Sequence, residues 1–503
     1  MKIAIFNFND ELSGEGSRII SSVLKEAGHD VIMVFMPFYG RQPIEFIDPK
    51  LLDRLAGRDL FMISLYSCYE GRAKEITKFL RENFKKPIVW GGVHPTAVPR
   101  QSLKYADLII RGEAESAVVE FCDKYEKGLD WRSVSNIAYL DGDGNYVENP
   151  LAQLPFELDS IPFPDYDLGT HWVLDNEKVV PCDERLLEKY HTVYYHDFPA
   201  YFVMTTRGCP FVCTYCYQSQ LVNTYPTREY QSRKLRYKSA DRTVEEIQWA
   251  IARYPFMRGV GFSDDDFCAR PLEEIQDFAV KYKEKIGLPF GCSAIPASLT
   301  EDKLQPLLEA GCKNIQIGIQ SGSDRLNREV YRRYLPKKKV LEALDLLTRY
   351  RFEKGYDFRV SCDWIIDCPW ETEEDVLESV NFSLEIPRWC QFNIFTLTYY
   401  PGTTLYDRAL AEGIITEDEN PYSQVFNVLN RVNHSYLTHV FLLKHRARRF
   451  APNRLIKILT SKPARAVGER LPKFLLNRVW GDWLFPKLAT IARADGITGS
   501  GAV

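Results

Sequence analysis

The chain of 503 residues has no uncharged stretch approaching the roughly 18 residues of a membrane-spanning helix, so we expect no such helix. No Gly-x-Gly-x-x-Gly pattern follows its first apolar run, which argues against a nicotinamide-binding domain. Met1–Phe6 has the pattern of a strand rather than of a charged and then apolar leader. With twelve cysteines, which we expect to be free, these absences predict a protein of the reducing cytoplasm. The net charge of −4 argues against the whole chain as a nucleic-acid binder.

The first 135 residues alternate short apolar runs with amphipathic stretches. The apolar runs are Lys2–Phe8, Asp30–Met36, Leu60–Tyr66, Pro87–Gly92 and Ala106–Gly112. Strands of this kind, separated by helices, predict a parallel sheet that is covered on both faces. We therefore expect an α/β, Rossmann-like domain over residues 1–135, with ligands at the carboxyl ends of its strands.

The pattern changes after this domain. Residues 136–198 combine an expected hairpin, Ile137–Glu148, with the proline-rich Ile161–Tyr166, and we interpret them as a hairpin and linker. A second series of strands and helices then predicts a partial (β/α)6 TIM-type barrel over residues 199–410. Its strands are Tyr201–Thr206, Gly259–Asp265, Phe290–Ile295, Asn314–Gly322, Phe358–Asp367 and Asn393–Tyr400. Residues 411–503 have the pattern of a helical, basic C-terminal region.

Three cysteines follow the first strand of the second series at C-x3-C-x2-C spacing: Cys209, Cys213 and Cys216. Three thiolates on one loop can hold three irons of a 4Fe–4S cluster and leave the fourth iron open to a small molecule. A zinc site would need a fourth ligand, and the chain has no second C-x2-C pair. A disulfide is disfavoured without a secretory signal, and unrelated buried thiols are the plain alternative.

With the aromatic Tyr215 just before its third cysteine, this loop resembles that of radical S-adenosylmethionine (SAM) enzymes. In that family the open iron binds the amino and carboxylate groups of SAM, and one electron cleaves SAM to a 5′-deoxyadenosyl radical. The resemblance implies that Cys209, Cys213 and Cys216 hold the cluster and that Tyr215 lies beside SAM. It also implies an electron donor such as flavodoxin or ferredoxin.

The resemblance implies further SAM contacts after later strands. The position after the second strand of the barrel contacts the amino group of SAM in the family, which marks Ser263, Asp264 and Asp265. After the fourth strand, relatives usually carry Glu where this chain has Gln320. An amide still hydrogen-bonds there, but without the assistance of a charge.

Two other groups of residues belong to the same edge of the barrel. Ser321 and Ser323 could reach the ribose or the carboxylate of SAM. After the fifth strand, Asp367, Cys368 and Trp370 depart from the Gly-Leu-Pro-Gly-Glu-Thr that relatives more often show. These departures indicate an unusual substrate, while Cys368 alone is better explained as a buried thiol.

A Rossmann-like domain ahead of a radical SAM core resembles the cobalamin-dependent class of the family, over nearly all of residues 1–410. Its signatures are Trp90–Thr96 and Arg111–Glu115, which follow the fourth and fifth strands. Paired glycines there would let a flat corrin approach the backbone. The resemblance implies cobalamin contacts from Ser64, Leu65, Gly91, Gly92, Val93, His94, Gly112 and Glu113.

One feature of many cobalamin domains is absent. No histidine of the chain stands in an Asp-x-His-x-x-Gly pattern, so we expect cobalamin to bind without that histidine as a ligand. Two alternatives stay open: the domain only shapes a substrate cleft, and His94 only packs a turn before Pro95.

The C-terminal region is basic and rich in apolar residues. Phe441–Arg478 holds eleven Lys and Arg but a single acid, Glu469. The apolar residues interleaved with them are Phe441, Leu442, Leu443, Phe450, Leu455, Ile456, Ile458, Phe474 and Leu475, with Trp480 beyond. Contact with an anionic membrane surface is our preferred functional interpretation, and it suggests a lipid-like substrate. A solvated helical cap and a site for a phosphate-bearing substrate or nucleic acid are the alternatives.

Our leading hypothesis is a cobalamin-dependent radical SAM methyltransferase that acts on an unactivated carbon. A radical SAM cyclase or carbon–carbon coupling enzyme is the first alternative. A methylthiotransferase would need three further clustered cysteines in the N-terminal domain, where only Cys68 and Cys122 occur. A cluster-bearing sensor is the non-enzymatic alternative.

Overall fold

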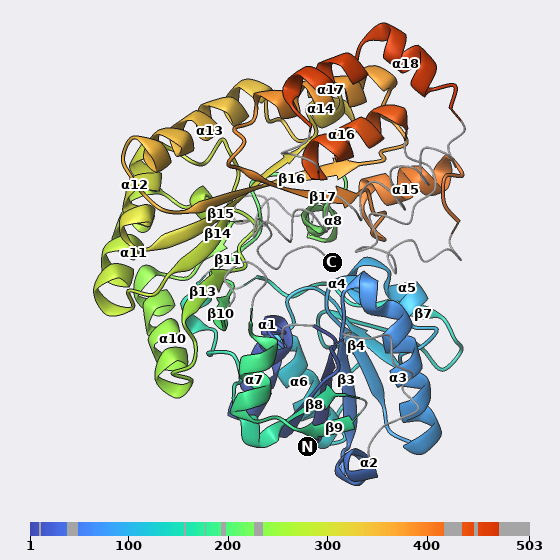
Figure 1. The fold of residues 1–503 in the computed structure, drawn as a ribbon. Helices are drawn as coiled ribbons and strands as arrows, with labels where there is room; N and C mark the ends of the chain where they lie inside the picture. Colours follow the sequence, from blue (N-terminus) through green and yellow to red (C-terminus); the bar gives the residue numbers. More distant parts are fainter. Residues whose placement is uncertain are drawn as a thin grey trace. The chain divides into compact units, whose positions relative to one another are not determined.

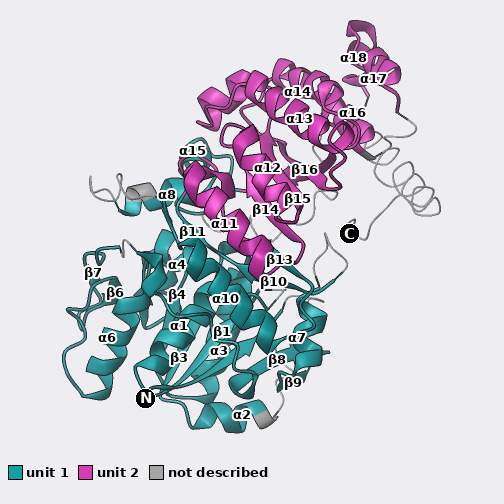
Figure 2. Cartoon of the chain, turned by 90° about the vertical axis from the view of Figure 1, so that its left-hand side faces the viewer, with its two compact units in different colours: residues 1–208, 216–261, 399–423 teal, residues 209–215, 262–398, 424–503 magenta. Residues whose placement is uncertain are grey.

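A computed structural model describes residues 1–9, 12–37, 49–154, 157–176, 178–192, 198–225, 235–416, 435–446 and 451–471. The chain forms two compact units (Figure 2). Unit 1 comprises residues 1–208, 216–261 and 399–423, and unit 2 comprises residues 209–215, 262–398 and 424–503.

Unit 1 contains a nine-stranded sheet of order β7-β6-β5-β4-β3-β1-β2-β8-β9. Strands β5, β4, β3, β1, β2 and β8 run parallel, and β6, β7 and β9 are antiparallel to their neighbours. The strands are β1 Lys2–Asn7, β2 Asp30–Phe35, β3 Leu60–Ser64, β4 Ile88–Gly91, β5 Leu108–Ile110, β6 Ile137–Leu140, β7 Tyr146–Glu148, β8 His171–Asp175 and β9 Lys178–Pro181.

Helices cover both faces of this sheet (Figure 1), as the apolar runs predict. Phe6 and Trp90 pack on one face, against α2 and α3. Ile5 and Val89 pack on the other, against α1 and α6. The helices of unit 1 are α1 Glu15–Glu26, α2 Pro49–Ala56, α3 Glu70–Asn83, α4 Val93–Ala97, α5 Pro99–Ser102, α6 Glu115–Glu126, α7 Glu184–Tyr190, α8 Tyr217–Thr224, α10 Ala240–Arg253 and α15 Thr404–Ala411.

Residues 136–198 are more than a hairpin and a linker. The hairpin is present as β6 and β7, and it extends the sheet beyond β5. Strand β8 then pairs with β2 at the other side of the sheet, and β9 follows it. Both additions use short strands, because three to five residues are enough to continue an existing hydrogen-bond ladder.

The second series of strands forms a six-stranded sheet of order β10-β13-β14-β15-β16-β17. Its six strands confirm the predicted alternation of strand and helix, and β14 to β17 run parallel. The strands are β10 Ala200–Val203, β13 Gly259–Phe262, β14 Phe290–Ala294, β15 Cys312–Gln320, β16 Arg359–Ile366 and β17 Gln391–Thr396. A separate two-stranded sheet pairs β11 Thr206–Arg207 with β12 Arg236–Tyr237. Strand β11 precedes the cysteine loop in sequence, and β12 follows it.

Side chains of β15 and β16 alternate between two environments, as a strand requires. Ile317 and Trp364 are buried on the face that the helices of unit 2 cover (Figure 1). Gln316 and Asp363 point to the opposite, polar face. The helices of unit 2 are α11 Leu272–Lys285, α12 Glu301–Glu309, α13 Lys337–Phe352, α14 Glu373–Glu385, α16 Tyr436–Arg446, α17 Asn453–Leu459 and α18 Lys462–Gly468, with a π-turn, η6, at Leu326–Val330.

The described part of the C-terminal region packs on unit 2. Helix α16 lies against α14, and the ring of Phe441 contacts those of Trp364 and Phe392 at centroid distances of 5.0 and 6.3 Å. Four residues of the predicted basic and apolar segment lie outside the described ranges: Phe450, Phe474, Leu475 and Trp480. Within those ranges no helix is long and apolar enough to cross a membrane, as the sequence predicts.

Candidate functional site

Two of the three cysteines, Cys209 and Cys213, belong to unit 2, and Cys216 belongs to unit 1. Within unit 2, the segment Cys209–Tyr215 is held by the last residue of η6 and by the residue after it. The Thr214 amide donates to the Tyr331 carbonyl at 3.0 Å, and the Thr214 hydroxyl donates to the Val330 carbonyl at 2.6 Å. The Tyr215 ring meets the Tyr331 ring edge-on at a centroid distance of 5.1 Å. The backbone directly after Cys213 therefore has a defined position.

A buried guanidinium lies beside the middle cysteine. Arg333 is 6% exposed, and its Nη1 lies 3.7 Å from Cys213 Sγ. Its Nη2 donates to the Gly318 carbonyl at 3.0 Å, and its charge stands over the Phe211 ring at 5.4 Å. Burial opposes the charge, but Tyr215 and the cysteines raise the pKa of Arg333 on balance. Arg333 was not a candidate from sequence, because no spacing relates it to the triad.

The cysteines fit a 4Fe–4S cluster in their chemistry. All three are free thiols; Cys213 is buried, and Cys209 and Cys216 are half-buried. Among the described residues, no three His, Cys, Asp or Glu side chains converge as ligands of one metal ion. A cluster differs from such a site, because each cysteine binds its own iron.

The loop after β13 separates its three expected SAM residues. Asp264 is buried and pairs with Arg270 Nη2 at 3.1 Å, while Ser263 and Asp265 are exposed. The next residue, Asp266, is buried and accepts bonds from the Ile295 amide and the Ser298 hydroxyl. Ser263 and Asp265 are thus the accessible candidates, and Asp264 and Asp266 fix the loop.

The end of β15 has a left-handed backbone at Gln320, where φ is +64°. The Oε1 atom of Gln320 is buried and has no hydrogen-bond partner within the described chain. Such a backbone conformation is costly for a residue other than glycine and is often found at functional sites. The orphaned oxygen and the strain make Gln320 the strongest SAM candidate at this strand.

Ser321 and Ser323 lie within the loop rather than on its surface. The Ser321 hydroxyl contacts Ser379 Oγ at 3.1 Å and accepts from the Ser323 amide at 3.0 Å. The Ser323 hydroxyl donates to Asp375 Oδ1 at 2.5 Å. Both hydroxyls have partners here, so their observed role is to shape the loop next to Gln320.

The end of β16 gathers acidic groups. Asp367 has a φ of +60°, and Glu371 follows it after one turn. Burial, Asp367 and Asp375 raise the pKa of Glu371 to about 8. Burial also raises the pKa of the Cys368 thiol to about 11, which keeps that thiol protonated. Glu371, which sequence reasoning did not single out, is therefore a carboxyl that holds its proton at neutral pH.

A row of polar side chains crosses β15, β16 and β17 on the polar face. Asp363 accepts from Gln316 Nε2 at 2.7 Å through one oxygen and from Asn393 Nδ2 at 2.9 Å through the other. Burial raises the pKa of Asp363, against the effect of these bonds and of Arg333. The row therefore provides hydrogen-bonding groups with fixed positions on the polar face of the sheet. The candidate site residues at the strand ends begin on that same face.

The expected cobalamin edge belongs to unit 1, where β3, β4 and β5 lie side by side and end together. A side chain on Gly92 would press on the Leu65 backbone at 3.0 Å and on Ser64 Oγ at 3.3 Å, and Gly92 has a φ of +96°. At Gly91 an added carbon would make only ordinary contact, 3.5 Å from the Ile110 carbonyl. Val93 begins α4 directly after this pair. The glycines leave the backbone edge bare, which fits a flat corrin.

The His94 side chain points into the domain. Its ring is 1% exposed, with Nδ1 at 3.1 Å from Ser67 Oγ and Nε2 at 3.7 Å from Glu70. Burial lowers the pKa of His94 to about 4, so the ring is neutral at pH 7. This is the environment that packing of a turn requires, and the His94 amide also donates to the Leu65 carbonyl at 3.3 Å.

Glu113 and Gly112 also have structural partners. Glu113 forms ion pairs with Arg207 at 2.7 Å and with Arg236, while Glu115 pairs with Arg207 at 2.5 Å. The Glu113 amide donates to Tyr225 Oη, and a side chain on Gly112 would collide with that oxygen at 2.0 Å. Arg207 stands two residues before Cys209 in sequence, and these ion pairs fix its position within unit 1.

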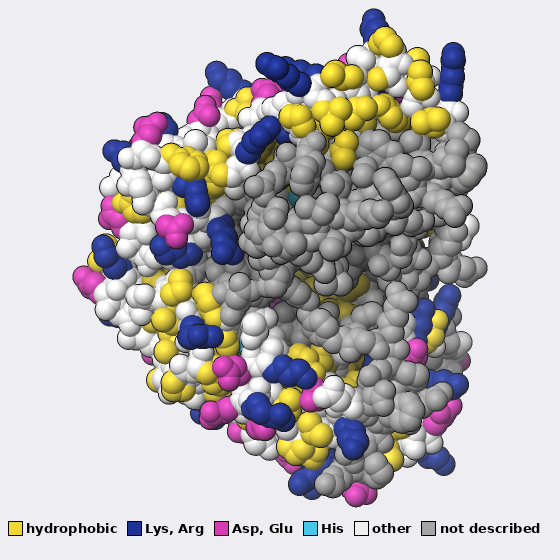
Figure 3. Space-filling view, viewed as in Figure 1, with side chains coloured by type: hydrophobic (Ala, Val, Ile, Leu, Met, Phe, Trp, Pro, Cys, Tyr) yellow, Lys and Arg dark blue, Asp and Glu magenta, His cyan; other side chains and the backbone are white. Residues whose placement is uncertain are grey.

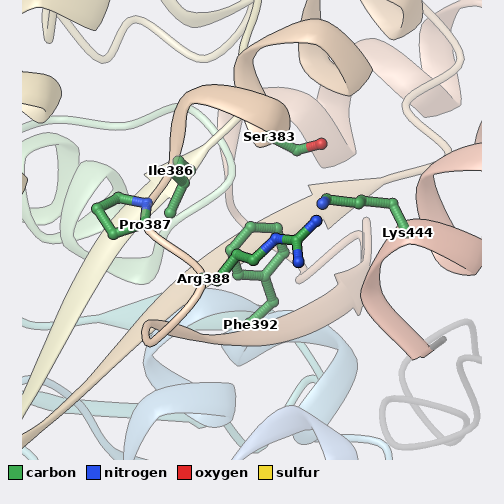
Figure 4. A pocket seen from close by; sticks show the side chains of 6 residues that line it. All are labelled: Ser383, Ile386, Pro387, Arg388, Phe392 and Lys444. Carbon is green, nitrogen blue, oxygen red and sulfur yellow. The ribbon is translucent and has the colours of Figure 1, made fainter. Parts of the chain in front are cut away.

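The described part of the C-terminal region has both buried and exposed apolar residues. Phe441, Leu442, Leu443 and Ile456 are buried in unit 2. Ile458 and Val467 are each 63% exposed, and Figure 3 shows hydrophobic side chains gathered near the top of the view, where Figure 1 places α16 to α18. A small pocket (Figure 4) is lined by Ser383, Ile386, Pro387, Arg388, Phe392 and Lys444, and none of the predicted site residues lines it. Internal packing thus accounts for four of the six interleaved apolar residues that the structure describes, while Leu455 is half-buried and Ile458 is exposed.

Two parts of the chain match known protein families. Residues 1–122 match the B12 binding domain, and residues 203–383 match the radical SAM superfamily. The first match covers the bare strand edge of unit 1, and the second begins just before the cysteine loop.

Related proteins agree with these matches. The chain is 26% identical, over 70% of its length and 68% of the relative's, to an uncharacterized methyltransferase of Pyrococcus horikoshii. It is 27% identical, over 64% of its length, to an anaerobic magnesium-protoporphyrin IX monomethyl ester cyclase of Rubrivivax gelatinosus, of which it spans only 59%. The cobalamin-dependent SAM radical enzyme OxsB, solved with aqua-cobalamin and SAM bound, has a similar fold, with a TM-score of 0.65 at 16% identity, over 99% of this chain and 81% of OxsB.

The cysteine triad, the six-stranded sheet and the Rossmann-like sheet are thus parts of one known combination of domains. Its cofactors are a 4Fe–4S cluster, SAM and cobalamin. The chain belongs to the radical SAM enzymes that carry an N-terminal cobalamin-binding domain.

Proposed function

We propose that this enzyme transfers a methyl group to an unactivated carbon of its substrate. The observation that carries the proposal is the presence of a B12 binding domain and a radical SAM domain in one chain. A methyl donor and a means of activating carbon are then both available. The relative named as a methyltransferase supports the same reaction class.

The cofactors supply radical and methyl-transfer chemistry, and the protein supplies binding and orientation. In this proposal Cys209, Cys213 and Cys216 hold the cluster, and Thr214 fixes their loop through its bonds to Tyr331 and Val330. Gln320 binds SAM through its buried amide.

Further SAM and cobalamin contacts complete the proposed site. Ser263 and Asp265 are exposed at the end of β13, where they can accept from the amino group of SAM. The backbone of Ser64, Gly91 and Gly92 gives the corrin a flat edge without side chains in the way.

The substrate end is polar rather than lipid-like. Asp363 with its two amide donors and the protonated Glu371 place hydrogen-bonding groups around β16. A buried polar group is costly unless it is paired, so a substrate that offers hydrogen bonds suits this face better than a hydrocarbon chain. The burial of Phe441, Leu442 and Leu443 removes the main reason to expect a lipid. We keep the reducing cytoplasm as the proposed compartment, which the twelve free cysteines support.

One reconstitution tests the proposal. The purified protein is loaded anaerobically with iron, sulfide and hydroxocobalamin, then incubated with SAM and dithionite. We expect retained cobalamin absorbance, iron–sulfur absorbance and 5′-deoxyadenosine. The Cys213→Ala variant should lose the iron and the 5′-deoxyadenosine, whereas Cys390→Ala, a buried cysteine outside the triad, should keep both. Failure of the wild type to retain cobalamin would remove methyl transfer from the proposal.

A cyclase is the second candidate, because the chain also resembles an anaerobic ester cyclase over 365 residues. The two reactions differ in product mass once a substrate is found. Methylation adds one carbon to the product, whereas oxidative cyclisation removes hydrogen and adds no carbon. SAM labelled in its methyl group distinguishes them, since only methylation transfers the label to the product.

A further inference from the structure

Arg333 is a buried cation without a matching anion among the described residues. It is 6% exposed, yet no described carboxylate lies within ion-pair distance of it. Its Nε atom is buried and lacks a hydrogen-bond partner in that same part of the chain. An unpaired buried charge is expensive, so a guanidinium placed here indicates that an anion belongs beside it.

The fold holds this guanidinium in one place. The Arg333 amide donates to the Asn327 carbonyl at 2.8 Å, and Arg332 before it has a left-handed φ of +49°. An added carbon on Gly318 would lie 2.9 Å from Arg333 Nη2, so glycine is needed there to admit the side chain. The preceding π-turn, Leu326–Val330, is a feature that often marks functional sites.

The nearest candidate for the anion is the cysteine loop. Nη1 of Arg333 lies 3.7 Å from Cys213 Sγ, which is within hydrogen-bonding distance for sulfur. A 4Fe–4S cluster held by thiolates is negatively charged and gains one more negative charge when it is reduced. Net charge, hydrogen bonds to the sulfurs and solvent exposure set its reduction potential. A buried cation at a cysteine sulfur therefore favours the reduced cluster.

We propose that Arg333 is a positioning residue that donates to the cluster ligand Cys213 and raises the reduction potential of the cluster. The inference rests on the proposed role of Cys213 as a ligand. When bound, the cluster would supply the electron for SAM cleavage, and Arg333 would make its reduced state accessible to a physiological donor.

The test measures potential rather than turnover. Wild type, Arg333→Gln and Arg333→Lys are reconstituted with iron and sulfide, their iron is counted, and EPR-monitored titration gives the midpoint potential. At a fixed applied potential we expect the ratio of reduced to oxidised cluster in Arg333→Gln to fall about tenfold, which is ~59 mV for a one-electron couple. Arg333→Lys keeps the charge and should stay nearer the wild type. Arg349→Gln removes an exposed cation and should change nothing, because solvent screens it.

The outcomes separate the inference from the cluster assignment. A wild type that binds no iron contradicts the assignment of Cys213 itself. An Arg333→Gln protein with full iron and an unchanged midpoint overturns the inference. If Arg333→Gln loses its iron, the Arg333→His variant provides the test. As rising pH removes the charge of the imidazolium, the midpoint potential of Arg333→His should fall relative to that of the wild type. Parallel pH curves for the two proteins would refute the role of charge.

Discussion

Two residues at strand ends have a strained backbone. Gln320 and Asp367 both have positive φ, and they end the neighbouring strands β15 and β16. Sequence comparison with the family had marked both as departures, but it could not show that their backbones are left-handed. The cost of this conformation is of the order of 1 kcal/mol or more per residue, which indicates that the surrounding packing maintains it.

Glu371 leads to a prediction about stability and pH. Burial, Asp367 and Asp375 raise its pKa to about 8 in the folded chain, from an ordinary value of 4.5. Between these values the folded state holds a proton that the unfolded state has released, so stability falls as pH rises. In Glu371→Gln this loss is absent. Thermal unfolding measures the effect. The melting temperature of Glu371→Gln should rise relative to that of the wild type from about pH 5 to pH 8, by ~2–4 °C for each kcal/mol of stability.

The control is Glu374→Gln, which changes an exposed carboxylate in the first turn of α14. Its melting temperature should follow that of the wild type at every pH. If Glu371→Gln also runs parallel to the wild type, the carboxyl of Glu371 titrates normally in the folded protein.

Elements that seemed peripheral in sequence contribute to the framework of the molecule. The segment 171–181 adds β8 and β9 to the N-terminal sheet, and Asp165 before it accepts from the Ser21 hydroxyl in α1. Arg18 of α1 donates to the Asp165 carbonyl and stands over the Tyr166 ring at 3.8 Å. Buried polar and cation–π contacts of this kind explain why a proline-rich stretch has a fixed path.

Helix α16 gives a prediction about packing. Phe441 is 3% exposed and contacts the rings of Trp364 and Phe392. Phe441→Ala removes these contacts and leaves a cavity, which should cost ~3–5 kcal/mol in the free energy of unfolding. Phe352→Ala, at a side chain that is 63% exposed, should cost much less. Urea unfolding measures both, and equal losses would show that α16 is not part of the core of unit 2.

At the scale of the whole molecule, the candidate cofactor residues fall into different units. Cys213, Arg333 and Gln320 belong to unit 2, and the bare strand edge with Gly91 and Gly92 belongs to unit 1. The nine-stranded sheet and its buried core lie in unit 1, and β14 to β17 of the six-stranded sheet lie in unit 2. A domain with its own core can retain a ligand by itself, so cobalamin contacts on the nine-stranded sheet do not require the cluster.

This division predicts independent loading of the two cofactors. Cys213→Ala should lose its iron but keep cobalamin at wild-type stoichiometry after gel filtration. The reverse change, Gly92→Val, should abolish cobalamin retention, because its side chain would strike Leu65 and a positive φ opposes it. The Gly92→Val protein should still bind about four irons per chain. Loss of both cofactors in either variant would contradict independent sites.

Much of the molecule follows from the sequence because local patterns carry it. Short apolar runs predict both sheets, since a buried strand needs apolar side chains whatever its neighbours. The triad Cys209, Cys213 and Cys216 is identified by spacing alone, because its ligands lie on one loop. The environments of Ser323, His94 and Glu113 could not be foreseen, since their partners Asp375, Ser67 and Arg207 lie 27 to 94 residues away.

The sequence alone therefore determined the class of chemistry, because cluster ligation depends on thiols close together in the chain. The tertiary structure decided which of the candidate side chains are accessible and which only shape the loops. It also placed Arg333 beside Cys213 across 120 residues of chain. Charge acts through space and burial rather than along the chain, so the electrostatic surroundings of the cysteines emerge only when the strands and loops have assembled.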